Sequence, residues 1–157
     1  MNPSSPSPAI PVVASLTVER VIRAPRSRVF AAFASVDELK QWFGPGECHV
    51  TDGEMRFESG GSYRLTMLTT DFGLADLVGE YREVVPDRRL VFTWRWTGNE
   101  AMEPWGEMLV TLELDDAPEG GTRLVLTHEG FLAPEIREGH EEGWDGSFEK
   151  LKRCHGR

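Results

Sequence analysis

Hydrophobic and polar residues alternate near the start of the chain, over residues 16–24. Leu16, Val18 and Ile22 fall on one side of this segment, and polar residues occupy most positions between them. Alternation with a period of two predicts a β-strand. Pro25 ends the strand and suits the first turn of a helix, where its missing N–H costs no hydrogen bond.

The pattern predicts two short helices after this strand. The first has an apolar face at helical spacing, formed by Val29, Phe30 and Phe33. The second can begin at Ser35 or Asp37, because both residue types accept hydrogen bonds from the free N–H groups at a helix start. Its apolar side consists of Leu39, Trp42 and Phe43.

A long run of strands and turns occupies residues 48–132. Its clearest strand carries four large apolar side chains on one face, at Leu90, Phe92, Trp94 and Trp96. Glycine pairs and a Pro-Asp step mark turns in the run, in which we expect about six strands. Short connections predict that neighbouring strands pair in antiparallel fashion.

The last segment changes to helical spacing. Pro134 opens this helix, and Gly139, Gly143 and Gly146 lie inside it. Each internal glycine costs about 1 kcal/mol relative to Ala, so we expect either close backbone packing there or room kept open for a bound molecule. An apolar stripe runs along the helix in steps of three or four residues, at Ile136, His140, Trp144, Phe148 and Leu151.

This order of elements predicts an α+β fold. A sheet of about six to seven antiparallel strands has an apolar face to cover, and the simplest solution curls the sheet around the single long C-terminal helix. Residues 1–15 are rich in Pro and Ser, which bury little apolar area, so we expect a flexible tail there. Residues 16–157 then form one domain, as the length of the chain suggests.

Composition and charge exclude several classes of function. The 17 Lys and Arg against 26 Asp and Glu give a net charge of −9, which opposes binding to the phosphates of nucleic acids. No segment approaches the roughly 18 apolar residues of a membrane span, and the N-terminus lacks the features of a signal peptide. Cys48 and Cys154 lie far apart in the sequence, which suits free thiols in a reducing compartment. The alternative of one disulfide between them is left open. We expect a cytoplasmic protein.

Two residues are candidates for acid–base catalysis. His128 falls on the apolar face of the last strand, where a histidine is either a hydrogen-bonded core residue or a group that titrates near neutral pH. Tyr63 is the second candidate. His140 precedes two glutamates, but the second histidine that a metalloprotease helix carries four residues later is absent. We expect no metal and no cofactor.

A curved sheet around one helix favours a cavity between them. The large aromatic residues either line this cavity or fill the space as ordinary core. Both interpretations stay open. A buried Arg20 needs a carboxylate partner, for which Glu80 is the candidate; without one, Arg20 is a candidate to hold an acidic group of a ligand. The candidate ligand-binding residues are Trp42, Tyr63, Met67, Trp94, Trp96, Leu112, Leu126, His128, His140, Trp144 and Phe148.

Short motifs spread over residues 16–151 resemble one known group. The matching segments are RVIRAP at 20–25, WFGP at 42–45, GGSY at 60–63, GEY at 79–81, RLVFTW at 89–94, GTRL at 121–124, THEGF at 127–131 and EGWDGSF at 142–148. Their order and spacing resemble the START-like, or Bet v 1-like, helix-grip superfamily (SRPBCC), and within it the branch named for the activator of Hsp90 ATPase homologue 1. The resemblance implies a curved antiparallel sheet that grips a C-terminal helix.

The resemblance is compatible with three functions, because function depends on the site and not on the fold. The first hypothesis is a binding domain that encloses a small hydrophobic molecule between the sheet and the C-terminal helix. The second is a cyclase- or hydrolase-like enzyme that uses the same cavity. The third is a chaperone-associated module; the eukaryotic namesake has a further N-terminal domain, where this chain has only the Pro/Ser tail. The sequence also leaves open whether the chain forms a homodimer.

Overall fold

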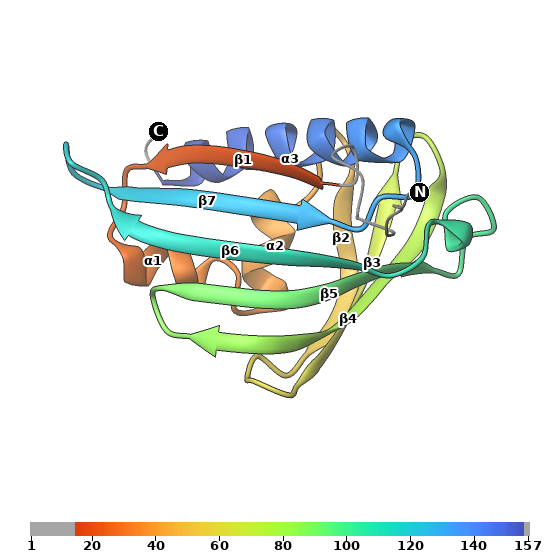
Figure 1. The fold of residues 1–157 in the computed structure, drawn as a ribbon, viewed down its shortest axis with the longest axis horizontal. Helices are drawn as coiled ribbons and strands as arrows, with labels where there is room; N and C mark the ends of the chain where they lie inside the picture. Colours follow the sequence, from red (N-terminus) through yellow and green to blue (C-terminus); the bar gives the residue numbers. More distant parts are fainter. Residues whose placement is uncertain (1–14, 156–157) are drawn as a thin grey trace, which may run out of the picture.

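The computed structural model describes residues 15–155 of the chain (Figure 1). It contains seven strands, two short α-helices, one 3-10 helix and one long helix. Along the chain these are β1 Ser15–Ile22, α1 Arg26–Ala31, α2 Val36–Trp42, β2 His49–Met55, β3 Ser62–Thr69, β4 Gly73–Val85, β5 Arg89–Thr97, η2 Glu103–Trp105, β6 Met108–Asp116, β7 Thr122–Glu129 and α3 Pro134–Cys154.

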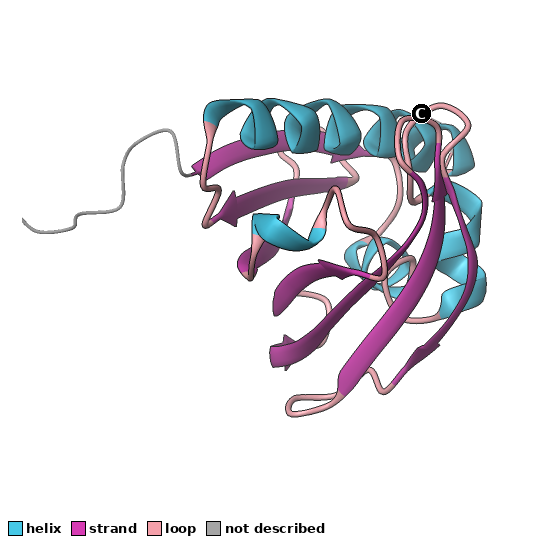
Figure 2. Cartoon of the chain, turned by 90° about the vertical axis from the view of Figure 1, so that its right-hand side faces the viewer, coloured by secondary structure: helices cyan, strands magenta, loops and turns pink. Residues whose placement is uncertain are grey.

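All seven strands belong to one antiparallel sheet with the order β1-β7-β6-β5-β4-β3-β2. From β2 to β7 each strand pairs with its neighbour in sequence, while β1 closes the far edge by pairing with β7. The strands curve beneath α3 (Figure 2). The α+β, helix-grip arrangement predicted from the sequence is therefore confirmed.

The core lies on the face of the sheet that looks toward α3. Alternate residues of β5, β6 and β7 are buried there, and the stripe of α3 packs against them. Leu112, Leu126, Phe148 and Leu151 are fully enclosed. Arg20 does not pair with Glu80, as we had expected, because its guanidinium reaches Asp145 of α3 at 2.7 Å.

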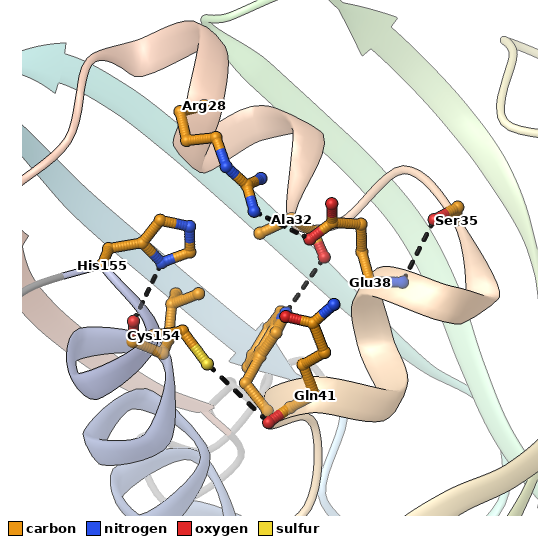
Figure 3. A network of polar contacts seen from close by, with 9 residues as sticks. Arg28, Ala32, Ser35, Glu38, Gln41, Cys154 and His155 are labelled. Carbon is orange, nitrogen blue, oxygen red and sulfur yellow. Dashed lines mark hydrogen bonds and ion pairs between the residues drawn. The ribbon is translucent and has the colours of Figure 1, made fainter.

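Helix α2 is held at both ends by the hydrogen bonds shown in Figure 3. Of the two predicted caps, Ser35 is the one used: its hydroxyl accepts from the Glu38 N–H at 3.1 Å. At the other end the Trp42 indole donates to the Ala32 carbonyl at 3.0 Å. The Cys154 thiol of α3 donates to the Gln41 carbonyl at 3.8 Å, which ties the ends of the two helices together.

The first strand begins and ends at slightly different residues than predicted. Ser15 belongs to β1, where it pairs with Glu129, and the rest of the predicted tail lies outside the described residues. β1 ends at Ile22 instead of continuing to residue 24. Within residues 15–155, no helix combines the length and the hydropathy that a membrane span requires.

Candidate functional site

A cavity of about 740 Å³ lies between α3 and the sheet. This volume falls within the roughly 300–1,000 Å³ of typical small-molecule sites. Five segments form the walls: the loop after α2, the end of β3 with the turn into β4, the second half of β5, the η2 region, and the N-terminal two-thirds of α3. The wall residues are Phe43–Cys48, Met67, Thr69–Phe72, Trp94, Trp96, Met102, Trp105, Glu135, Ile136, Gly139, His140, Glu142–Trp144 and Ser147.

The inner wall is apolar and largely aromatic. Trp94 and Trp96 of β5 and Trp144 of α3 are each less than a tenth exposed, and all three line the cavity. Met67 and Met102 add flexible thioether side chains, which adapt to ligands of different shape. A wall of this kind can bind an apolar molecule by removing its surface from water.

The three glycines of α3 lie in two different surroundings. A Cβ on Gly139 or Gly143 would have no neighbour within 4 Å, and both glycines line the cavity. A Cβ on Gly146 would lie 2.5 Å from Cβ of Pro45, so this glycine permits close packing. The missing side chains at Gly139 and Gly143 widen the cavity, whereas Gly146 brings the helix against the loop after α2.

Two indole–imidazole hydrogen bonds connect α3 to the sheet. Trp96 of β5 donates its indole N–H to Nε2 of His140 at 3.1 Å, and Nδ1 of His140 lies 2.8 Å from the Ile136 carbonyl. Because Nε2 accepts, Nδ1 carries the proton and donates to that carbonyl. In the opposite direction, Trp144 of α3 donates to Nδ1 of His128 at 3.0 Å.

Both histidines are neutral at neutral pH. Burial lowers the pKa of His140 to about 4. Burial lowers the pKa of His128 well below its usual value, and the nearby His140 lowers it further. Protonation would also remove the nitrogen lone pair that accepts the indole N–H. The remaining nitrogen of His128, Nε2, faces the sulfur of Met108 at 3.3 Å.

Neither catalytic candidate is placed to exchange a proton with a molecule in the cavity. His128 is fully buried and is not part of the cavity wall. The Tyr63 hydroxyl donates to the Thr93 carbonyl at 2.6 Å, and burial raises the pKa of Tyr63 well above its usual value. This geometry favours the structural interpretation of both residues over the catalytic one.

The predicted ligand-binding residues divide into two groups. Five line the large cavity: Met67, Trp94, Trp96, His140 and Trp144. Tyr63 instead borders a separate, much smaller void of about 30 Å³. The others lie elsewhere in the core, at Trp42, Leu112, Leu126, His128 and Phe148. For both groups a role in ligand binding stays a prediction.

Several cavity residues were missed at the sequence level. Phe72, in the β3–β4 turn, packs edge-on against Trp105 of η2 with 5.4 Å between ring centroids. Asn99 fixes this turn, because its side-chain amide donates to the carbonyls of Phe72 and Leu74. Turn residues of this kind carry no periodic signal, whereas the three glycines of α3 indicated either close packing or open space without separating the two. Across residues 15–155, no three His, Cys, Asp or Glu side chains are grouped as a metal site requires.

The family model for "Activator of Hsp90 ATPase homolog 1-like protein" matches residues 23–156. The chain belongs to this family. The family assignment and the observed architecture agree with the START-like fold expected from the motifs. No match to the chain was found among proteins of curated function.

Three solved structures illustrate the similarity. The AHSA1 protein from Silicibacter pomeroyi is 27% identical with a TM-score of 0.77, over 89% of this chain and 96% of that one. A putative uncharacterized protein from Rhizobium leguminosarum is 30% identical with a TM-score of 0.70, over 89% and 95%. A protein from Chromobacterium violaceum is 24% identical with a TM-score of 0.76, over 92% and 98%, and at that identity it shows the fold alone.

Proposed function

We propose that this chain binds a small hydrophobic molecule in the cavity between α3 and the sheet. The observation that carries the proposal is the cavity itself, whose volume of about 740 Å³ is bounded by Trp94, Trp96 and Trp144. A core that served only stability would be filled, because each void forfeits contact energy in proportion to its volume.

The glycines of α3 support the same function. Two helix-destabilising residues, Gly139 and Gly143, face the cavity with no neighbour in reach. Each costs about 1 kcal/mol of helix stability relative to Ala, although Ala would fit at either position. A binding role accounts for this cost, because larger side chains there would occupy the space that a ligand needs.

The histidine geometry favours binding over catalysis. Both imidazoles use their acceptor nitrogen for an indole N–H, so neither offers a base to a bound molecule. The enzyme-like alternative therefore has no observation in its favour in the part of the chain described. The chaperone-associated alternative stays a prediction.

The test is a fluorescence titration with N-phenyl-1-naphthylamine, a neutral apolar probe that brightens when it leaves water. We expect saturable binding at one site per chain. Gly143→Phe is expected to weaken binding about tenfold or more by filling the cavity. Gly143→Ala is the matched control, because it changes helix propensity in the same direction without filling the space; it should bind as the original chain does.

Thermal unfolding of both variants shows whether each is folded, and Gly139→Phe provides a second cavity-filling change if Gly143→Phe is not. The probe should also raise the melting temperature of the original chain, since a ligand that binds the native state stabilises it. Equal binding by the Phe and Ala variants, or no saturable binding to the original chain, would contradict the proposed function.

A further inference from the structure

The border of the cavity is acidic. Four carboxylates belong to its wall, from the loop after α2, the β3–β4 turn and two turns of α3: Glu47, Asp71, Glu135 and Glu142. All four are exposed, and none forms an ion pair with any residue in the described range 15–155. The cavity mouth therefore carries negative charge that no ion pair within residues 15–155 compensates.

No lysine or arginine of the described residues is part of the cavity wall. On α3, Arg137 is turned away to Glu141 and to the Ser15 carbonyl. Lys150 does not line the cavity, but its Nζ donates to the carbonyl of the wall residue Cys48 at 3.3 Å. A ligand with an acidic group would have no cation to pair with in the wall.

Two of the four tryptophans that line the cavity have no free N–H to offer an anion, whereas the buried Nε1 of Trp94 has no hydrogen-bond partner among residues 15–155. The indole N–H groups of Trp96 and Trp144 are already donated to His140 and His128. These two indoles can therefore offer a ligand only carbon and π surface. Aromatic faces carry negative partial charge and attract cations, most strongly where water is excluded.

The N-terminal end of α3 would by itself favour the binding of an anion. The N-terminus of a helix has a partial positive charge that attracts anions within its first turn. Glu135 occupies that first turn and also borders the cavity. Its carboxylate offsets the helix charge, so the acidic character of the border extends to the start of the helix.

We propose that the hydrophobic ligand of this cavity is positively charged at one end, as in an apolar amine or a quaternary ammonium compound. The apolar body fills the aromatic interior, and the cation lies at the border among the four carboxylates. The site is the cavity, and the carboxylates select the charge of what enters it. This inference rests on the proposed function and deepens it.

The test compares three ligands with the same ten-carbon body: decyltrimethylammonium, 1-decanol and decanoate. Their dissociation constants are measured by displacement of N-phenyl-1-naphthylamine at low salt. We expect the cation to bind about tenfold or more tightly than decanoate, and this ratio to shrink at 1 M NaCl, where charges are screened within about 3 Å. A tighter affinity for decanoate would overturn the proposal.

A charge-matched pair of variants separates the cavity border from the overall negative charge. Glu142→Gln removes a border carboxylate, while Glu149→Gln removes an exposed carboxylate of the same helix that does not line the cavity. We expect Glu142→Gln to weaken decyltrimethylammonium binding about threefold, with 1-decanol unchanged, and Glu149→Gln to have a smaller effect on both. The double change Glu142→Gln and Glu135→Gln should enlarge the difference.

The outcomes distinguish the two proposals. Equal weakening by Glu142→Gln and Glu149→Gln would show that only the net charge of the chain attracts the cation, and it would overturn the border proposal. Saturable binding of the neutral probe with no preference for the cation would also overturn it, while leaving the proposed function intact. Failure of the neutral probe to bind would contradict the proposed function itself.

Discussion

Trp144 of α3 donates its indole N–H to Nδ1 of His128 of β7 at 3.0 Å, inside the core. Four residues earlier on the same helix, His140 accepts the indole N–H of Trp96 from β5. The helix is thus a donor in one contact and an acceptor in the other. These two directional bonds fix the height and rotation of α3 above the sheet, and with them the width of the cavity.

Removal of the Trp144 indole N–H should lower the stability of the folded chain. Trp144→Phe leaves Nδ1 of His128 buried without its donor, and we expect a loss of about 1–3 kcal/mol in the free energy of unfolding beyond the loss of ring volume. The control is Trp94→Phe, because Nε1 of Trp94 is buried and has no hydrogen-bond partner among residues 15–155. Urea unfolding of both variants provides the comparison; equal losses would contradict the role given to the bond.

Stability should fall in mild acid because of the buried histidines. The pKa of His140 is about 4 in the folded chain, against roughly 6.5 when unfolded. The unfolded chain therefore takes up the proton first, and the free energy of unfolding decreases as the pH falls from about 6.5 to about 4. The loss from His140 amounts to about 3 kcal/mol at the lower end. His128 shifts in the same direction.

Urea unfolding at several pH values tests this assignment. His140→Gln removes one titrating group, so its stability should depend less on pH, with a slope smaller by up to about 1.4 kcal/mol per pH unit between pH 4.5 and 6. The slope is informative even if the variant is less stable throughout. Parallel slopes for the two chains would show that His140 is not the group responsible.

Two glycines of α3 should respond to alanine in opposite ways. Gly139→Ala meets no neighbour within 4 Å and should stabilise the chain by about 1 kcal/mol through helix propensity. Gly146→Ala places a Cβ against Pro45 and should destabilise by about 1–3 kcal/mol. Thermal unfolding measures both. A gain in stability at Gly146 would mean that the loop after α2 is free to move away from the helix.

A bound molecule should protect one of the two thiols. Cys48 lines the cavity, whereas Cys154 lies exposed near the end of α3, and both are free. With saturating N-phenyl-1-naphthylamine we expect alkylation of Cys48 by iodoacetamide to slow several-fold and that of Cys154 to keep its rate. Peptide mass spectrometry follows both sites in one sample. An unchanged rate at Cys48 would argue that the probe binds elsewhere.

The fold could be predicted from periodicity, because strands and helices differ in the spacing of their buried residues. The stripe from His140 to Leu151 on α3 and the alternation through Trp94 on β5 are both confirmed as inward-facing. The predicted pairing of Arg20 with Glu80 was wrong. Which carboxylate meets a given guanidinium depends on how α3 lies across β1, and periodicity does not encode that position.

The cavity was harder to predict than the fold. Inward-facing residues such as Trp94 and Leu126 look alike in a sequence, yet only the first borders the cavity. The difference arises from sheet curvature and from the absence of side chains at Gly139 and Gly143. Phe72 and Trp105 reach the cavity from turns, where three-dimensional contacts alone bring them together.

The most direct test of the binding account is a ¹H–¹⁵N NMR titration that follows the five tryptophan indole signals as N-phenyl-1-naphthylamine is added. Four of the indoles belong to residues of the cavity wall, and Trp42 is the internal control because it is buried in the core and is not part of the wall. We predict that the signals of Trp96, Trp105 and Trp144 shift and saturate at one probe per chain while that of Trp42 stays in place. Unchanged indole signals, or a shift at Trp42 as large as those of the wall residues, would contradict a ligand site in this cavity.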